Sequence, residues 1–125
     1  MSENEIATSI IVAAIEIHRI TGPGLLESAY ESALAYDLSN MGLQVRIQHP
    51  QPFIYRGVKM DIGYRIDLLV EDKVIVEIKS LERLAPVHYA QTLTYLKLSG
   101  LKLGLLINFN TALLKDGIRR LVNKL

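Results

Sequence analysis

Two carboxylates and an amine in one short stretch of the chain could together hold a metal ion and activate water. They are Asp67, Glu77 and Lys79. Mg²⁺ is typically bound in proteins by one or two carboxylates, together with waters and substrate phosphate oxygens. A neighbouring ammonium group could orient or deprotonate a metal-bound water and stabilise developing negative charge. The alternative is a solvated sheet face with a Glu–Lys pair, and these three residues alone leave both interpretations open.

The two carboxylates come together if the chain between them folds as a β-hairpin. Two runs of β-branched and aliphatic residues, 64–70 and 74–80, flank the polar triplet 71–73, which predicts strand, turn and strand. A three-residue loop gives one wholly apolar face, whereas a two-residue loop scrambles both faces, so the pattern favours the longer loop. The apolar face then pairs Val70 with Val74, Leu68 with Val76 and Ile66 with Ile78. The other face pairs Leu69 with Ile75, Asp67 with Glu77 and Arg65 with Lys79.

In this register Asp67 and Glu77 are direct neighbours on one face of the sheet. Their Cβ atoms would lie about 5 Å apart, and two like charges at that separation repel each other. A hard divalent cation, Mg²⁺ or alternatively Mn²⁺, would offset this repulsion. Lys79 projects from the same face as Glu77, because side chains alternate along a strand. The spacing therefore suits a magnesium site with a lysine beside it, and the solvated sheet face stays the alternative.

Length and composition limit the class of protein. The chain has 125 residues, of which 50% are hydrophobic and 22% charged, and we expect one folded domain over residues 1–125. It contains no cysteine, which excludes disulfides, thiolate catalysis and cysteine-bound zinc. The net charge of +1 indicates that any nucleic-acid-binding surface must be a local patch. No apolar run approaches the length of a membrane span, so we expect a soluble cytoplasmic protein with no membrane partner.

Helices and further strands are predicted on both sides of the hairpin. Hydrophobic periodicity and breaker residues predict helices over residues 4–19, 25–41 and 86–99, and strands over residues 44–48, 53–60 and 102–109. The segment 49–52, with prolines at both even positions, is expected to be a turn or a sheet edge. The tail 113–125 is ambiguous, because its apolar spacing suits a helix but Gly117 interrupts one.

Polar residues outside the hairpin are candidates for the same site. Glu27, in the first turn of the second predicted helix, either stabilises the helix dipole or reaches the hairpin as a third carboxylate. Gln91 and Tyr95 share one face of the helix 86–99. That face is either solvated or meets the hairpin, where Gln91 could bond a metal-bound water or a phosphate. The basic tail is either a phosphate-binding patch or a terminal segment whose long side chains reach solvent.

The order of these elements and motifs resembles the PD-(D/E)XK nuclease superfamily, whose αβββαβ core carries an acid on one strand and Glu-x-Lys on the next. Asp67 matches the first acid, and the segment 77–79, Glu-Ile-Lys, matches the second motif. The segment 91–95 matches the Gln-x-x-x-Tyr signature of the exonuclease branch. More closely, the chain is similar to the small family named for its GxxExxY motif, which is present at residues 24–30.

This resemblance implies a restriction-endonuclease-like α/β fold, with an αβββαβ core, a mixed central sheet flanked by helices and an extra N-terminal helix. It also implies a Mg²⁺-dependent phosphodiesterase that acts on nucleic acid, DNA in the first place. Asp67 and Glu77 would bind the metal, with the Ile78 carbonyl as a further ligand. Glu27 is the core-helix acid in the family pattern and would bind the metal directly or through water. Lys79 would position the attacking water.

The same resemblance assigns supporting roles and leaves one alternative open. Gln91 and Tyr95 would support the metal site, and Lys102, Arg119 and Arg120 would contact the nucleic-acid backbone. A homodimer presenting two sites is expected by analogy with small resolvases and restriction enzymes. The alternative is a catalytically silent nucleic-acid- or protein-binding module that retains the fold, because the superfamily includes members that have lost catalysis.

Overall fold

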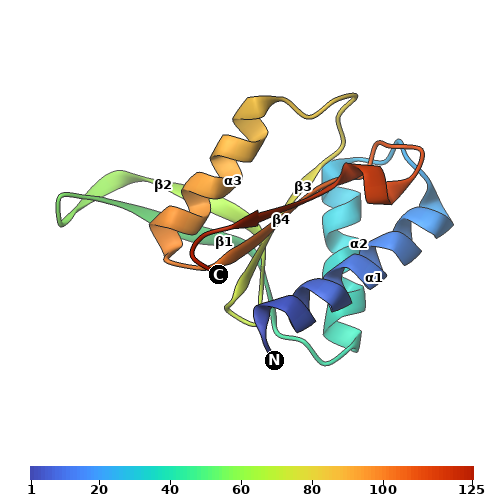
Figure 1. Cartoon of the computed structure of the whole chain (residues 1–125), viewed down its shortest axis with the longest axis horizontal. Helices are drawn as coiled ribbons and strands as arrows, with labels where there is room; N and C mark the ends of the chain where they lie inside the picture. The colour runs from blue at the N-terminus through green and yellow to red at the C-terminus, as the bar shows by residue number, and fades with distance from the viewer.

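The computed structural model describes all residues from 1 to 125 and has three layers (Figure 1). A five-stranded sheet, in the order β1-β2-β3-β4-β5, separates two helices on one face from one helix on the other. The helices are α1 (Glu3–Thr21), α2 (Glu27–Asn40) and α3 (Pro86–Ser99), and the strands are β1 (Val45–Tyr55), β2 (Val58–Val70), β3 (Val74–Lys79), β4 (Leu103–Asn108) and β5 (Ile118–Val122). A short 3-10 helix, η1 (Leu114–Gly117), precedes β5.

The sheet is mixed, as predicted. Strands β3 and β4 are parallel, and every other neighbouring pair is antiparallel. The elements from α2 to β4 follow the predicted αβββαβ order, with α1 as the extra N-terminal helix. The expected restriction-endonuclease-like architecture is therefore confirmed. None of the helices is both long enough and apolar enough to span a bilayer.

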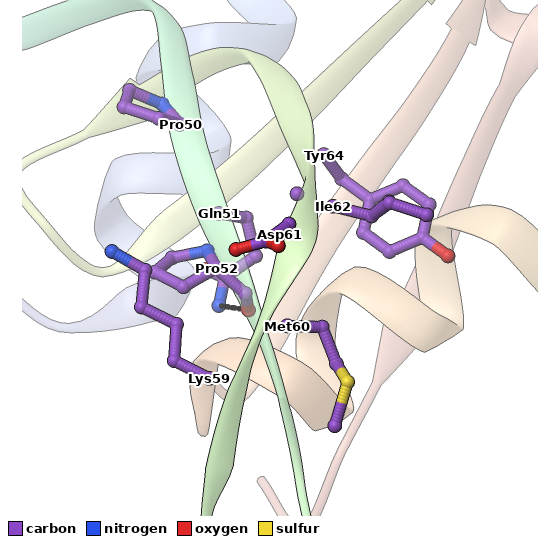
Figure 2. A pocket seen from close by; sticks show the side chains of 9 residues that line it. Pro50, Gln51, Pro52, Lys59, Met60, Asp61, Ile62 and Tyr64 are labelled. Carbon is purple, nitrogen blue, oxygen red and sulfur yellow. Dashed lines mark hydrogen bonds between the residues drawn. The ribbon is translucent and has the colours of Figure 1, made fainter.

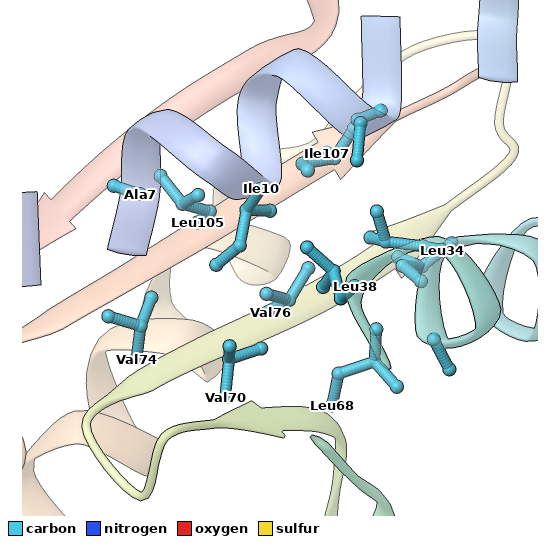
Figure 3. Packing of buried hydrophobic residues seen from close by; sticks show 14 of the residues in the cluster. Ala7, Ile10, Leu34, Leu38, Leu68, Val70, Val74, Val76, Leu105 and Ile107 are labelled. Carbon is cyan, nitrogen blue, oxygen red and sulfur yellow. The ribbon is translucent and has the colours of Figure 1, made fainter. Parts of the chain in front are cut away.

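The larger hydrophobic core lies between the sheet and the helices α1 and α2. It contains 21 buried residues, among which Ile10 of α1 and Leu38 of α2 lie close to Val76 of β3 (Figure 3). A smaller core under α3 consists of Ile66, Leu69, Ile75, Tyr95 and Leu96. The central strand β3 is thus buried on both faces, and this fixes the register of its neighbours, since a slip of one residue would exchange the two faces.

Strands β1 and β2 form one long hairpin, and its outer half projects from the body of the protein as an arm (Figure 1). Of the two alternatives for residues 49–52, the sheet edge is confirmed and the turn does not form. Strand β1 continues through Pro50 and Pro52 because it is an edge strand, where a missing N–H is tolerated. The turn lies instead at Arg56 and Gly57, whose φ angles of 52° and 78° are both positive, as a two-residue type I′ turn requires.

The ambiguous tail forms the 3-10 helix η1 and strand β5 rather than an α-helix. Strand β5 pairs with β4 in antiparallel register, with Ile118 opposite Ile107. Gly117 is required at the junction, because a Cβ atom there would collide with the backbone oxygen of Asn108. Gly117, which made a helix unfavourable in the sequence, therefore permits the close approach of β5 to the end of β4.

Tyr30 joins the start of α2 to the larger core. Its buried ring stacks on Phe109 with the centroids 4.2 Å apart. Its hydroxyl donates to the carbonyl of Gly22 at 2.7 Å and accepts the N–H of Leu25 at 3.1 Å. The N-cap residue that precedes this helix, Leu26, makes no side-chain cap hydrogen bond, so Tyr30 helps to hold the loop that leads into Glu27.

The Tyr30→Phe variant should lose about 1–3 kcal/mol in the free energy of unfolding, because two backbone groups in a partly buried loop lose their common partner. Denaturant unfolding of the variant and the wild type measures this loss. Tyr36→Phe is the matched control, since Tyr36 lies on the same helix and is 68% exposed. Equal stability of both variants would contradict the role given to the Tyr30 hydroxyl.

Candidate functional site

The β2–β3 hairpin has the predicted three-residue loop. The paired residues are Val70 with Val74, Leu69 with Ile75 and Leu68 with Val76. Beyond these pairs, side-chain contacts replace the backbone ladder. The N–H of Ile78 donates to Asp67 Oδ2 at 2.8 Å, and the N–H of Asp67 donates to Glu77 Oε1 at 3.2 Å. The two carboxylates therefore lie side by side where β2 and β3 separate.

The rest of the predicted register was wrong, because the backbone pairs Asp67–Glu77, Ile66–Ile78 and Arg65–Lys79 do not form. Ile66 packs with Tyr95 in the smaller core, although Leu68, two residues later, belongs to the larger core on the other face. The alternation of side chains is thus interrupted at Asp67. The physical reason is that the Asp67 carboxylate turns toward β3 to accept the Ile78 N–H, in place of a backbone carbonyl.

Glu77 is an acid in an environment that disfavours its charge. Its exposed fraction is 3%. Burial first, and then the neighbouring Asp67 carboxylate, raise the pKa of Glu77 to about 9. The positive charge of Lys79 lowers the pKa of Glu77 only slightly, and the two salt bridges of the protein lie elsewhere. Near neutral pH the Glu77 side chain therefore keeps its proton unless a cation replaces it.

The carboxylate pair fits a hard divalent cation. Its donors are carboxylate oxygens, which Mg²⁺ and Mn²⁺ prefer, and a bound cation would offset the repulsion that raises the pKa of Glu77. No group of three or more acidic or histidine side chains is placed to hold a metal ion. The protein therefore offers a two-carboxylate site, and water or substrate phosphate would have to fill most of the remaining coordination positions.

Glu27 reaches the same region but bonds to the backbone. Its Oε2 accepts the N–H of Ser80 at 3.1 Å, and the Ser80 hydroxyl donates to the carbonyl of Leu25 at 2.8 Å. Ser80 directly follows Lys79, the last residue of β3. Glu27 thus ties the start of α2 to the end of the strand that carries Glu77 and Lys79, and it does not join the carboxylate pair in a three-acid cluster.

Helix α3 brings Tyr95 to the carboxylate pair. The Tyr95 side chain is 5% exposed, and its ring lies 5.7 Å from that of Tyr64. Burial, followed by the charges of Glu77 and Asp67, raises the pKa of Tyr95 to about 12, so the phenol keeps its proton. Gln91 lies one turn earlier on the same helical face and is partly buried. The predicted contact of this face with the hairpin is therefore present at Tyr95.

The predicted phosphate-contacting residues do not form one patch. Arg119 and Arg120 are adjacent in β5, so their side chains leave opposite faces of the sheet. Arg120 donates to Asn4 of α1, whereas Arg119 donates to backbone carbonyls within its own segment. Lys102 lies before β4 and lines a depression of about 480 Å³ together with Lys97 and Lys124. These three lysines form one cationic group, which joins the predicted Lys102 and Lys124 of the basic tail to Lys97, a residue that the sequence did not indicate.

Gln48 of β1 is a site residue that the sequence did not indicate. Its side-chain amide donates to Glu31 at 2.8 Å and to Asp67 at 3.2 Å. Burial and the charge of Asp67 raise the pKa of Glu31, while the bond from Gln48 lowers it. Gln48 would face Asp67 in a long β1–β2 hairpin, but residues 49–52 were predicted as either a turn or a sheet edge, so the sequence did not predict this hairpin.

A separate depression of about 460 Å³ lies on the arm (Figure 2). Residues from both strands line it, including Pro50 and Pro52 of β1 and Lys59 and Tyr64 of β2. Asp61 is its only acidic lining residue, and it has no histidine. This depression therefore lacks the ligands for a metal site, and the chemistry is better placed at the carboxylate pair at the base of the arm.

The family of the chain follows from comparison with known proteins. A family model described as the PD-(D/E)XK nuclease superfamily matches residues 4–121, a span that includes Asp67, Glu77 and Lys79. No curated protein and no solved structure gives a significant match. The matched span runs from the first turn of α1 into β5, so it covers the sheet and all three helices. The chain belongs to the PD-(D/E)XK nuclease superfamily.

Proposed function

We propose that the protein is a metal-dependent phosphodiesterase that hydrolyses nucleic acid, with DNA as its expected substrate. Superfamily membership supports a nuclease. The observation that carries the proposal for this chain is the contact between Asp67 and a buried Glu77 that is in neither salt bridge of the protein. A purely structural hairpin would be more stable without two opposed acids at this position.

In this proposal Asp67 and Glu77 hold Mg²⁺ or Mn²⁺, with the Ile78 carbonyl as a further oxygen donor. The metal, when bound, supplies a Lewis acid and lowers the pKa of its bound water. Lys79 orients the attacking water and stabilises negative charge on the phosphate. Tyr95 keeps its proton beside the acids and can donate it in a hydrogen bond, and Gln91 is placed one turn away. Glu27 holds the end of β3 through Ser80.

We propose that the chain belongs to the GxxExxY group within the superfamily. Each fixed residue of the motif has a distinct part in the structure. Gly24 adopts a φ of 102°, which favours glycine. Glu27 bonds to Ser80 after β3, and Tyr30 stacks on Phe109 while it bridges the loop before α2. The motif thus accounts for how α2 is joined to the end of β3.

The second candidate function is a catalytically silent binding module for nucleic acid or protein. One observation favours it: an oxygen of Asp67 and an oxygen of Glu77 already accept backbone N–H groups. The two carboxylates therefore already have some of their hydrogen-bond partners without a metal. On this alternative, binding to nucleic acid should depend on salt and on the lysines around Lys102, and should be unchanged by loss of Lys79.

The proposed metal site is tested by titrating Mn²⁺ into wild-type protein and Asp67→Ala in a calorimeter. The wild type should bind the ion, and Asp67→Ala should bind it at least about tenfold more weakly. Asp61→Ala is the matched control, because Asp61 is an exposed aspartate on the same strand outside the pair, and it should bind like the wild type. If Asp67→Ala kept the metal affinity and the stability of the wild type, the paired-carboxylate interpretation would be wrong.

A further inference from the structure

We propose that Gln48 is a positioning residue, which holds the Asp67 carboxylate in the orientation needed for metal binding and links it to Glu31. This inference rests on the proposed metal-dependent function. It assigns a role to a residue of the edge strand β1, outside the strands that carry the two acids.

The backbone of Gln48 is in an unusual conformation for a strand residue. Its φ of 49° is in the left-handed region, which is uncommon for residues other than glycine. The flanking residues, Ile47 and His49, pair with Leu68 and Ile66 in one continuous register, but Gln48 leaves the ladder. The guanidinium of Arg65 donates to the Gln48 carbonyl at 3.2 Å and so holds this peptide group in place. The strand thus keeps its register while it turns one side chain toward the site.

The side chain of Gln48 helps to fix the orientation of the Asp67 carboxylate. Asp67 Oδ1 accepts from the Gln48 amide, and Asp67 Oδ2 accepts from the Ile78 N–H. Donors from β1 and β3 therefore fix both oxygens of a carboxylate on β2. The other bond of the same amide runs to Glu31 of α2, so Gln48 is itself held from the helix layer.

A neutral amide suits this position better than a cationic side chain. Its two N–H groups can satisfy two carboxylates at once, yet it carries no charge that would compete with a metal ion. Because the Gln48 side chain is exposed, its orientation toward Asp67 depends on the left-handed backbone rather than on packing in the core. Sites in which the metal-binding side chains are oriented by further hydrogen bonds typically lose about 10–100-fold in metal affinity when that partner is removed.

A purely structural explanation is that Gln48 only bends the arm. Two substitutions separate the explanations, because Gln48→Gly relaxes the left-handed backbone and Gln48→Ala does not, while both remove the amide. If Gln48 positions Asp67, Mn²⁺ affinity should fall about 10–100-fold in both variants, whereas the melting temperature of Gln48→Gly should exceed that of Gln48→Ala. Gln44→Ala, just before the same strand, is the matched control and should bind Mn²⁺ like the wild type.

A measurement without metal keeps this inference separable from the proposed function. The melting temperatures of Gln48→Ala, Asp67→Ala and the double variant form a cycle, and a direct link between the two residues predicts shifts that do not add. Wild-type protein that bound no Mn²⁺ would overturn the proposed function and, with it, the positioning role toward a metal. Additive melting shifts, or Mn²⁺ affinity unchanged in both Gln48 variants, would overturn the inference while leaving the proposed function in place.

Discussion

Lys79→Ala should lose about 10²–10³-fold in kcat on the nucleic acid that the wild type cleaves, and it should keep its fold and its Mn²⁺ affinity. Lys79 lies two residues beyond Glu77 at the end of β3, partly buried, and neither salt bridge of the protein involves it. Its backbone carbonyl, which accepts the N–H of Phe109, is kept in the variant. The substitution therefore removes a positive charge from the site without removing a structural contact.

The assay compares initial rates for wild type, Lys79→Ala and Lys73→Ala at saturating Mg²⁺. Lys73 is the matched control, because it lies at the loop end of the same hairpin and its ammonium donates only to the carbonyl of Met1. Lys73→Ala should cleave at the wild-type rate. Full activity of Lys79→Ala would contradict the role of this lysine, and a variant that lost activity and its fold together would show a structural role instead.

Glu77→Gln should make the metal-free protein more stable than the wild type, and the difference should grow as the pH rises. The ordinary pKa of a glutamate is 4.5, whereas burial and Asp67 raise that of folded Glu77 to about 9. Between these values the folded state keeps a proton that the unfolded state releases. The contribution of Glu77 to the free energy of unfolding is therefore fully present below about pH 4.5. It falls as the pH rises toward 9, by up to about 1.4 kcal/mol per pH unit.

Thermal melts of wild type, Glu77→Gln and Glu82→Gln from pH 5 to pH 9 in the presence of a chelator measure this dependence. Glu82 is an exposed acid three residues after Lys79, and its variant should follow the wild-type profile. The difference between wild type and Glu77→Gln isolates Glu77, because Glu31, whose pKa is also raised, is common to both. Parallel profiles for wild type and Glu77→Gln would show that the charge of Glu77 is not suppressed in the folded protein.

The sequence was sufficient to predict the centre of the fold. The alternation of apolar residues on both sides of the triplet 71–73 predicts one register, because only that register buries a complete apolar face, and its first three pairs form. The bounds of α3 also follow from local signals. Pro86 can begin a helix, and Gly100 adopts the left-handed conformation that ends one, so the predicted helix 86–99 is confirmed.

The sequence was not sufficient where side chains replace backbone bonds. The ladder between β2 and β3 stops because the Asp67 carboxylate accepts the Ile78 N–H, a contact that period-2 alternation does not include. The left-handed backbone of Gln48 has no composition signal, since glutamine rarely adopts it. Prolines 50 and 52 indicated either a turn or a sheet edge and could not decide between them, because their place on an edge strand depends on the order of the whole sheet.

The central claim is that this carboxylate pair supports metal-dependent cleavage of nucleic acid. It is tested most directly by incubating wild type and Asp67→Ala with single-stranded, duplex, flap and four-way DNA and with RNA, in Mg²⁺, in Mn²⁺ and in chelator. We predict cleavage of at least one substrate by the wild type, only with metal, and none by Asp67→Ala. If the wild type bound Mn²⁺ and cleaved none of these substrates, the claim would be contradicted, and the binding module would become the better account.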